Sequence, residues 1–126
     1  MAKTQLRKVA EICIVAEQPL RVAARQLDLS DQQVGAIKNT HECWKAAIEI
    51  QYNKTKKTMQ RRGVTRAVIR QAVAMFTNRA MTTTEIDEAL SLKPGTTKLL
   101  TAHKLWRTEK LRQLQFGEEA EEEDAK

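Results

Sequence analysis

The sequence has few aromatic residues and few glycines. Of its 126 residues, 4% are Phe, Trp or Tyr and 4 are glycine. This composition argues against a sheet-rich sandwich and against an aromatic platform for stacking nucleic-acid bases, and it favours helices. No apolar run approaches the roughly 18 residues that a membrane-spanning helix needs, and the first residues lack the features of a signal peptide. We therefore expect an all-α, cytoplasmic protein with no membrane partner.

Cysteine is also scarce, and no catalytic constellation is present. Cys13 and Cys43 fall inside helical patterns, so we expect reduced thiols in the core. His41 and His103 each stand three residues before a tryptophan on an apolar stripe, and we expect packed histidines rather than metal ligands. Because the chain has no Ser/His/Asp set, glycine-rich phosphate loop or paired acids in apolar surroundings, it predicts no enzyme activity, cofactor or small-molecule substrate.

The net charge of +6 is distributed unevenly along the chain. Residues 118–126 contain six acids and one base, a net charge of −5. The remaining residues, 1–117, contain 21 Lys/Arg and 10 Asp/Glu, a net charge of +11. A body this basic favours a polyanionic partner, and the acidic end is typical of a disordered tail.

Apolar periodicity predicts about six helices. The first half is expected to contain helices over residues 6–16, 20–27 and 31–60, the last capped by Ser30 and carrying one continuous apolar stripe. The second half is expected to contain a helix capped by Thr65 and ending near 78, a short helix over 82–90, and a final helix from 93 to about 116.

Short segments of the two halves resemble each other. Residues 40–45 (THECWK) align with 102–107 (AHKLWR) at an offset of 62, and residues 27–30 (LDLS) align with 90–93 (LSLK) at an offset of 63. We therefore predict two related halves, 1–62 and 63–117, followed by the acidic tail 118–126. Chance similarity between short helical segments is the alternative.

Residues 20–39 meet the requirements of a helix-turn-helix unit. Such a unit needs a small residue in its first helix, a sharp turn with left-handed backbone, and apolar residues that join its two helices. Aspartate tolerates the left-handed conformation, so Asp28 is an acceptable turn residue. The positions that match are Ala23, Ala24, Leu27, Asp28, Leu29, Val34 and Ile37.

This segment resembles the helix-turn-helix regulators of bacteria, phages and plasmids. In particular, Leu27-Asp28-Leu29-Ser30, followed by Val34 and an aromatic-bearing helix, is similar to small plasmid repressors of the KorA/TrfB type. The resemblance implies that the helix from Asp31 onward is a recognition helix that lies in the major groove. It also implies that the protein regulates transcription, most simply as a repressor.

Residues suited to base and phosphate contact occur on this predicted unit. Gln and Asn can pair with adenine, lysine with guanine, and the Ala36 methyl can touch thymine. The predicted base-reading residues are Asp31, Gln32, Gln33, Gly35, Ala36, Lys38 and Asn39. The predicted phosphate contacts are Arg21, Arg25, Ser30, Lys54, Lys56, Lys57, Arg61 and Arg62. For the lysine and arginine cluster after residue 53, a solvated helix face is the alternative.

The second half fits the motif less well. Asp87 stands where a small residue is required, and Thr97 stands where an aliphatic one is required. The following segment still carries donors suited to phosphate, so further DNA contacts are predicted at Lys93, Thr96, Thr97 and Lys98. A degenerate copy used for packing or dimerisation is the alternative.

These observations predict a sequence-specific double-stranded DNA-binding protein. We expect a homodimer, because one short recognition helix rarely supplies enough specificity, although a monomer could span two sites if both halves read DNA. Two other functions fit the same residues. One is a nonspecific nucleic-acid-binding protein of the nucleoid or RNA-binding kind, and the other is a helical interaction module that docks a partner through Ile37, Trp44, Ile48 and Met59.

Deleting residues 118–126 is expected to tighten nonspecific binding to DNA, because the acidic tail competes with phosphate for the basic body. The measurement is a titration of a random-sequence duplex with the full chain and with the truncated chain. Equal affinities would contradict the prediction.

Overall fold

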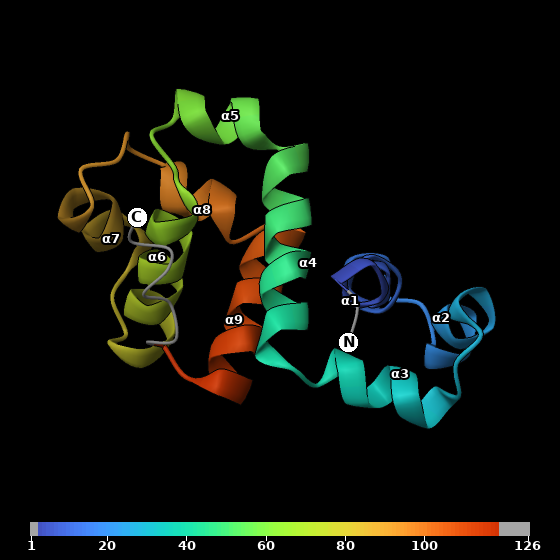
Figure 1. The fold of residues 1–126 in the computed structure, drawn as a ribbon. Coiled ribbons are helices and arrows are strands. Elements are labelled where there is room, and N and C mark those ends of the chain that lie inside the picture. Colours follow the sequence, from blue (N-terminus) through green and yellow to red (C-terminus); the bar gives the residue numbers. More distant parts are fainter. Residues whose placement is uncertain (1–2, 119–126) are drawn as a thin grey trace. The chain divides into compact units, whose positions relative to one another are not determined.

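The structure is a computed structural model that describes residues 3–118, and every regular element in this range is helical (Figure 1). The elements are α1 (Lys3–Val9), the π-helical segment η1 (Ala10–Val15), α2 (Leu20–Leu27), α3 (Asp31–Lys38), α4 (His41–Lys54), α5 (Lys56–Arg61), α6 (Arg66–Asn78), α7 (Thr83–Ala89), α8 (Thr96–Leu100) and α9 (Lys104–Phe116). The predicted all-α class is confirmed. Over the same residues, no helix combines the length and the apolar character needed to cross a bilayer.

The prediction of one continuous helix from residue 31 to about 60 is wrong, because two breaks divide this segment into α3, α4 and α5. At the first break, the Thr40 hydroxyl donates to the Ile37 carbonyl (2.7 Å) and accepts from the Cys43 amide (3.2 Å). At the second, the Thr55 hydroxyl donates to the Tyr52 carbonyl (3.3 Å). Threonine side chains that bond nearby backbone groups compete with the helical hydrogen bonds.

The predicted final helix is divided in the same way. It was expected to run from residue 93 to about 116, whereas α8 ends at Leu100 and α9 begins at Lys104. The Thr101 hydroxyl donates to the Lys98 carbonyl (2.7 Å), as the Thr40 hydroxyl does to Ile37. Apolar periodicity continued across these short breaks, so it did not reveal them.

The chain divides into two compact units, unit 1 (Met1–Gln51) and unit 2 (Tyr52–Lys126), and the boundary lies within α4. The predicted halves 1–62 and 63–117 concern a sequence repeat rather than compactness, and they stay a prediction. Of the predicted acidic tail, only Glu118 lies within the described residues. Its carboxylate accepts hydrogen bonds from Asn78 Nδ2 and Arg79 Nη2, both at 2.9 Å.

Unit 1 is built around α2 and α3, which pack on each other and on α1 and η1. Ala23 and Ala24 of α2 are buried together with Val34 and Ile37 of α3. Small alanines allow two helices to approach closely, while the branched side chains of α3 fill the space between the helices. The burial pattern that was predicted for residues 20–39 is therefore present at these four positions.

The turn between α2 and α3 has the predicted backbone conformation. Asp28 lies in the left-handed region, with φ 56° and ψ 47°, and the Leu29 amide donates to the Ala24 carbonyl at 2.9 Å. Ser30 then caps α3, as predicted. Its hydroxyl accepts from the Gln33 amide (3.0 Å), and the Gln33 side-chain carbonyl accepts from the Ser30 amide (2.9 Å), which completes a capping box.

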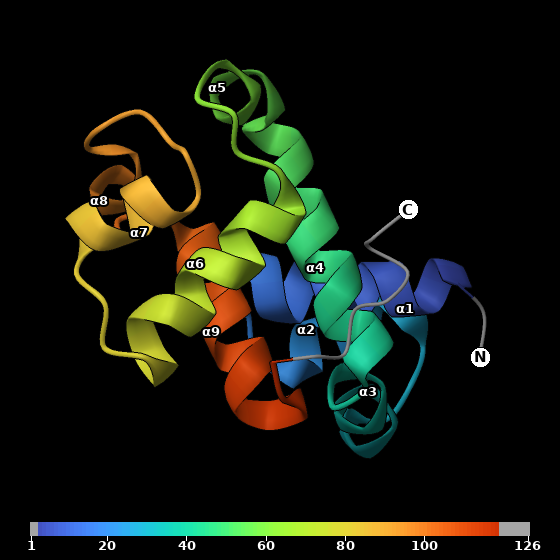
Figure 2. The same cartoon turned by 90° about the vertical axis from the view of Figure 1, so that its left-hand side faces the viewer.

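In unit 2, α6 packs on α9 and α7, and α7 packs on α8 (Figure 2). Thr65 caps α6 and Thr82 forms a capping box with Glu85 at the start of α7, so both predicted helix starts are confirmed. Between α6 and α9, the rings of Phe76 and Trp106 meet edge to face at 5.8 Å.

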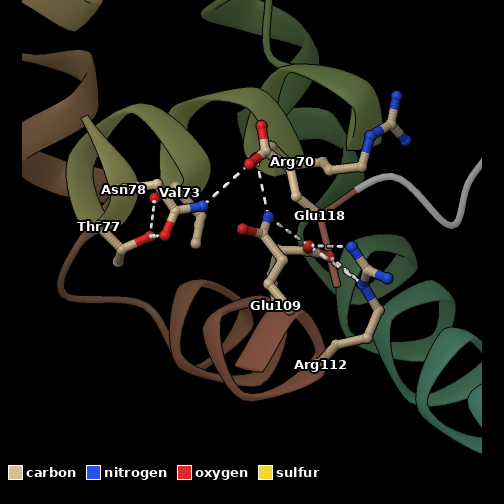
Figure 3. A network of polar contacts seen from close by, with 8 residues as sticks. Arg70, Val73, Thr77, Asn78, Glu109, Arg112 and Glu118 are labelled. Carbon is tan, nitrogen blue, oxygen red and sulfur yellow. Dashed lines mark hydrogen bonds and ion pairs between the residues drawn. The ribbon is translucent and has the colours of Figure 1, made fainter. Parts of the chain in front are cut away.

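A buried polar network also joins α6 to α9 (Figure 3). Arg112 of α9, 1% exposed, donates to the Glu109 carboxylate through Nε (3.1 Å) and Nη2 (2.7 Å). Gln113 links this pair to α6 by donating to Glu109 (2.7 Å) and to the Arg70 carbonyl (2.9 Å). Removing either Glu109 or Arg112 would leave the other charge buried without its partner, and the hydrogen bond from Gln113 to the Arg70 carbonyl connects this pair to α6.

The backbone of the two units shares unusual conformations at a constant spacing. The four non-glycine residues with positive φ among residues 3–118 form two pairs 63 positions apart, Glu17 with Ala80 and Asp28 with Ser91. The hydrogen bond from the Leu92 amide to the Asp87 carbonyl (2.8 Å) is likewise 63 positions from the bond at the Asp28 turn. A shift of 63 positions carries α2 onto residues 83–90 and α3 onto residues 94–101, ranges that overlap α7 and α8.

Asp87 and Thr97 form a buried polar link between α7 and α8. The Asp87 carboxylate accepts from the Thr97 amide (2.8 Å), the Thr97 hydroxyl (2.7 Å) and the Gly95 amide (2.9 Å). At an offset of 63, the same positions in unit 1 are Ala24 and Val34, both buried. The two residues that fit the motif poorly in sequence are therefore hydrogen-bonded partners in the structure.

Asp87→Ala is expected to lower the free energy of unfolding by about 3 kcal/mol, because the buried amide and hydroxyl of Thr97 and the part-buried amide of Gly95 lose their acceptor. The double variant Asp87→Ala/Thr97→Val, which copies the pair in unit 1, should recover part of this loss because it also removes the orphaned hydroxyl. Urea unfolding of the wild type, Asp87→Ala, Thr97→Val and the double variant measures the coupling free energy between the two positions. Strictly additive effects would contradict the proposed link.

Candidate nucleic-acid interface

One side of α3 is exposed and polar, opposite the side that is buried. Gln32, Ala36 and Asn39 are all exposed, and their spacing of four and three places them on one face, which we call the α3 face. Val34 and Ile37 lie on the opposite, buried side. The helical period thus gathers three of the seven predicted base-reading residues on one surface.

Two further predicted base-reading residues, Asp31 and Gln33, stabilise the N-terminus of α3. Asp31 is exposed in the first turn, where its negative charge complements the helix dipole. Gln33 is exposed, but its side-chain carbonyl already accepts from the Ser30 amide. The capping bond fixes the direction of the Gln33 side chain, so this residue is less free than Gln32 to orient its amide toward a base.

Gly35 and Lys38 lie closer to the core than predicted. A Cβ atom at Gly35 would be 3.5 Å from Cδ1 of Leu20, so the start of α2 covers this position. Lys38 is half-buried, and its positive charge acts on the thiols of both Cys13 and Cys43. Both residues therefore lie at the edge of the α3 face rather than within it.

Three predicted phosphate contacts are exposed in unit 1. Arg21 and Arg25 are one turn apart on α2, and Ser30 lies at the start of α3. The Ser30 hydroxyl accepts from the Gln33 amide and can still donate its own proton to an acceptor.

The remaining predicted phosphate contacts belong to α4, α5 and their ends. Lys54, Lys56, Lys57 and Arg61 are exposed. Arg62 is half-buried, and its Nη1 donates to the Thr96 hydroxyl oxygen at 3.2 Å. The Arg62 side chain is therefore hydrogen-bonded to a buried residue of unit 2, although it also carries a positive charge.

Two of the four predicted contacts in the second half are wrong. Thr96 and Thr97 are 0% exposed, because Thr96 is bonded to Arg62 and Thr97 to Asp87. Lys93 and Lys98 are exposed. Nζ of Lys93 donates to the Arg61 carbonyl at 3.2 Å, which brings the α7–α8 connection against the end of α5.

The two thiols lie in the core of unit 1. Burial raises the pKa of Cys43 to about 12, the nearby Cys13 contributes to the rise, and Lys38 opposes it. Burial likewise raises the pKa of Cys13, again against the charge of Lys38. Within residues 3–118, no three His, Cys, Asp or Glu side chains gather as a metal site, and His41 and His103 are half-buried.

Comparison with known proteins identifies no relative of this chain. It matches no family model, and neither the curated proteins nor the solved structures contain a significant match.

Cys13 and Cys43 are expected to resist alkylation by iodoacetamide at pH 8 in the folded protein, because the thiolate is the reactive form and both pKa values are raised. In urea both should react as ordinary thiols. Mass spectrometry over a time course measures the difference. Equal rates in the folded and the unfolded protein would contradict the burial of these thiols.

Proposed function

We propose that this protein binds double-stranded DNA in a sequence-specific manner, with α2 and α3 acting as a helix-turn-helix and α3 as the recognition helix. The observation that carries the proposal is the α3 face. It presents Gln32, Ala36 and Asn39 to the surface of a helix whose other side is held in the core by Val34 and Ile37. Arg21 and Arg25 flank it with positive charge on α2.

The size and chemistry of the α3 face suit a major groove. An α-helix with its side chains is about 10–12 Å across, and the groove is about 12 Å wide. Glutamine and asparagine can pair with adenine through two hydrogen bonds, and an alanine methyl can touch the thymine methyl. We therefore infer that the preferred site is rich in A·T pairs where α3 contacts it.

We further propose that the chain arose by duplication of one helical unit. The support is the spacing of 63 that relates Glu17 to Ala80 and Asp28 to Ser91, all with positive φ. Left-handed backbone is costly for residues other than glycine, so two such pairs at the spacing of the sequence repeat are difficult to ascribe to chance. The segment 82–100 then corresponds to the helix-turn-helix.

In this proposal the protein regulates transcription by occupying its site, and a homodimer reads two half-sites. A single recognition helix contacts few base pairs, and pairing two copies doubles the information that is read.

Selection of bound duplexes from a random pool at about 150 mM salt tests the proposal under ordinary screening. A recovered motif supports it, and the spacing of half-sites within the motif reports whether two copies bind. Binding without a motif would favour a nonspecific nucleic-acid-binding protein. No binding would favour an interaction module for another protein.

Gln32→Ala is expected to weaken binding to the selected site by about 5- to 150-fold, which corresponds to the loss of one bidentate base contact. Binding to a scrambled duplex should be unchanged, because the scrambled site never made that contact. Gln71→Ala, which alters an exposed glutamine on α6, is the matched control. If Gln32→Ala and Gln71→Ala bind the selected site equally well, α3 is not the reading helix.

A further inference from the structure

The positive charge of the chain is concentrated in unit 2. Residues 1–51 contain 7 Lys/Arg and 6 Asp/Glu, a net charge of +1, although they include the α3 face. Residues 52–118 of unit 2 contain 14 Lys/Arg and 5 Asp/Glu, a net charge of +9, and residues 119–126 add five acids and one lysine, so the whole unit has a net charge of +5. The unit that is proposed to read bases is thus almost neutral.

This separation matters because phosphate contacts supply most of the affinity of nonspecific DNA binding and a large share of specific binding. Base contacts supply the discrimination between sequences. A nearly neutral unit can discriminate between sequences while gaining little from the phosphate charge. Most of the electrostatic attraction to DNA is then expected to come from unit 2, beyond what Arg21 and Arg25 contribute in unit 1.

In unit 2 the positions equivalent to Gln32 and Gln33 carry no exposed polar side chain. At the offset of 63, Gln32 corresponds to Gly95, which has no side chain, and Gln33 corresponds to Thr96, which is 0% exposed. The equivalent of Val34 is Thr97, whose hydroxyl is bonded to Asp87. The part of unit 2 that matches the first turn of α3 therefore presents no side chain suited to reading bases.

Lysines and arginines remain exposed on this unit and are brought together by the fold. Arg61 ends α5, and its carbonyl accepts a hydrogen bond from Nζ of Lys93 on the α7–α8 connection, 32 residues away. Lys56 and Lys57 are exposed on the same short helix as Arg61. We call these four residues, Lys56, Lys57, Arg61 and Lys93, the α5 basic surface.

We propose that unit 2 binds the phosphate backbone of the DNA duplex through the α5 basic surface, without reading its sequence. This inference rests on the proposed function and divides it between the units, with discrimination in unit 1 and electrostatic affinity in unit 2. Lys93 also caps the end of α5. An ammonium group has three donors, so the bond to Arg61 leaves capacity for a phosphate oxygen.

The salt dependence of binding tests this division. Affinities for the selected site and for a scrambled duplex are measured at several salt concentrations, for the wild type, Arg61→Ala, Lys56→Ala/Lys57→Ala and Gln32→Ala. Each lost phosphate contact lowers the slope of log affinity against log salt by about one. We expect a loss of about one for Arg61→Ala and about two for the lysine pair, equal on both duplexes.

Two further variants serve as controls. Lys110→Ala removes one exposed charge from α9, outside the α5 basic surface, and should leave the slope nearly unchanged. Lys93→Gln removes the charge but keeps an amide donor for the Arg61 carbonyl, so an equal loss of slope in Lys93→Ala and Lys93→Gln assigns the effect to the charge rather than to the cap on α5. Circular dichroism and urea unfolding establish that each variant is folded.

The outcomes separate this inference from the proposed function. If the α5 variants keep the slope of Lys110→Ala while Gln32→Ala still loses only the selected site, the backbone contact lies elsewhere and this inference is overturned. If the α5 variants lose affinity for the selected site alone, unit 2 reads sequence and the inference is also overturned. If the wild type binds no duplex, or binds all duplexes equally, the proposed function fails and this division fails with it.

Discussion

The left-handed backbone at Asp28 is the constraint on which the α3 face depends. It reverses the chain within three residues, so that α3 packs on α2 through Val34 and Ile37 and its other side stays exposed. Aspartate accepts this conformation more readily than most residues, and the capping box at Ser30 starts the next helix at once. A β-branched residue at position 28 would strain this turn, whereas glycine or asparagine would accept its left-handed backbone.

A residue in the left-handed conformation also follows α7 in unit 2. Ser91 has φ 57°, and the Asp87–Thr97 hydrogen bonds hold α7 to α8, whereas the positions 63 residues earlier are the buried Ala24 and Val34. The connection to α8 is longer than the turn at Asp28, because Gly95 (φ 86°) precedes the helix, and α8 contains five residues. Thr97 uses its hydroxyl and its amide in bonds to Asp87, so neither group is left at the surface.

Several features were accessible from sequence because they depend on near neighbours. The side chains of Ser30, Thr65 and Thr82 each accept a hydrogen bond from a backbone amide in the first turn of the helix that follows. The burial of Ala24 and Val34 follows from helical spacing. The breaks at Thr40 and Thr55 were not predicted, because the apolar spacing continues across them. The burial of Thr96 and Thr97 was not predicted either. It depends on hydrogen bonds with Arg62 and Asp87, and only the packing of the helices brings those residues into place.

The sequence by itself determined the all-helical class, the helix starts at Ser30, Thr65 and Thr82, and the left-handed turn at Asp28, because capping and turn preferences act over a few residues. Only the tertiary structure decided which side chains are left for a partner. It placed Thr97 in a buried hydrogen bond with Asp87, it placed the charge of Lys38 near the thiols, and it brought Lys93 to the Arg61 carbonyl. Whether a polar side chain is free to bind a partner depends on which other groups of the protein already bond to it, and most of those groups are distant in the sequence.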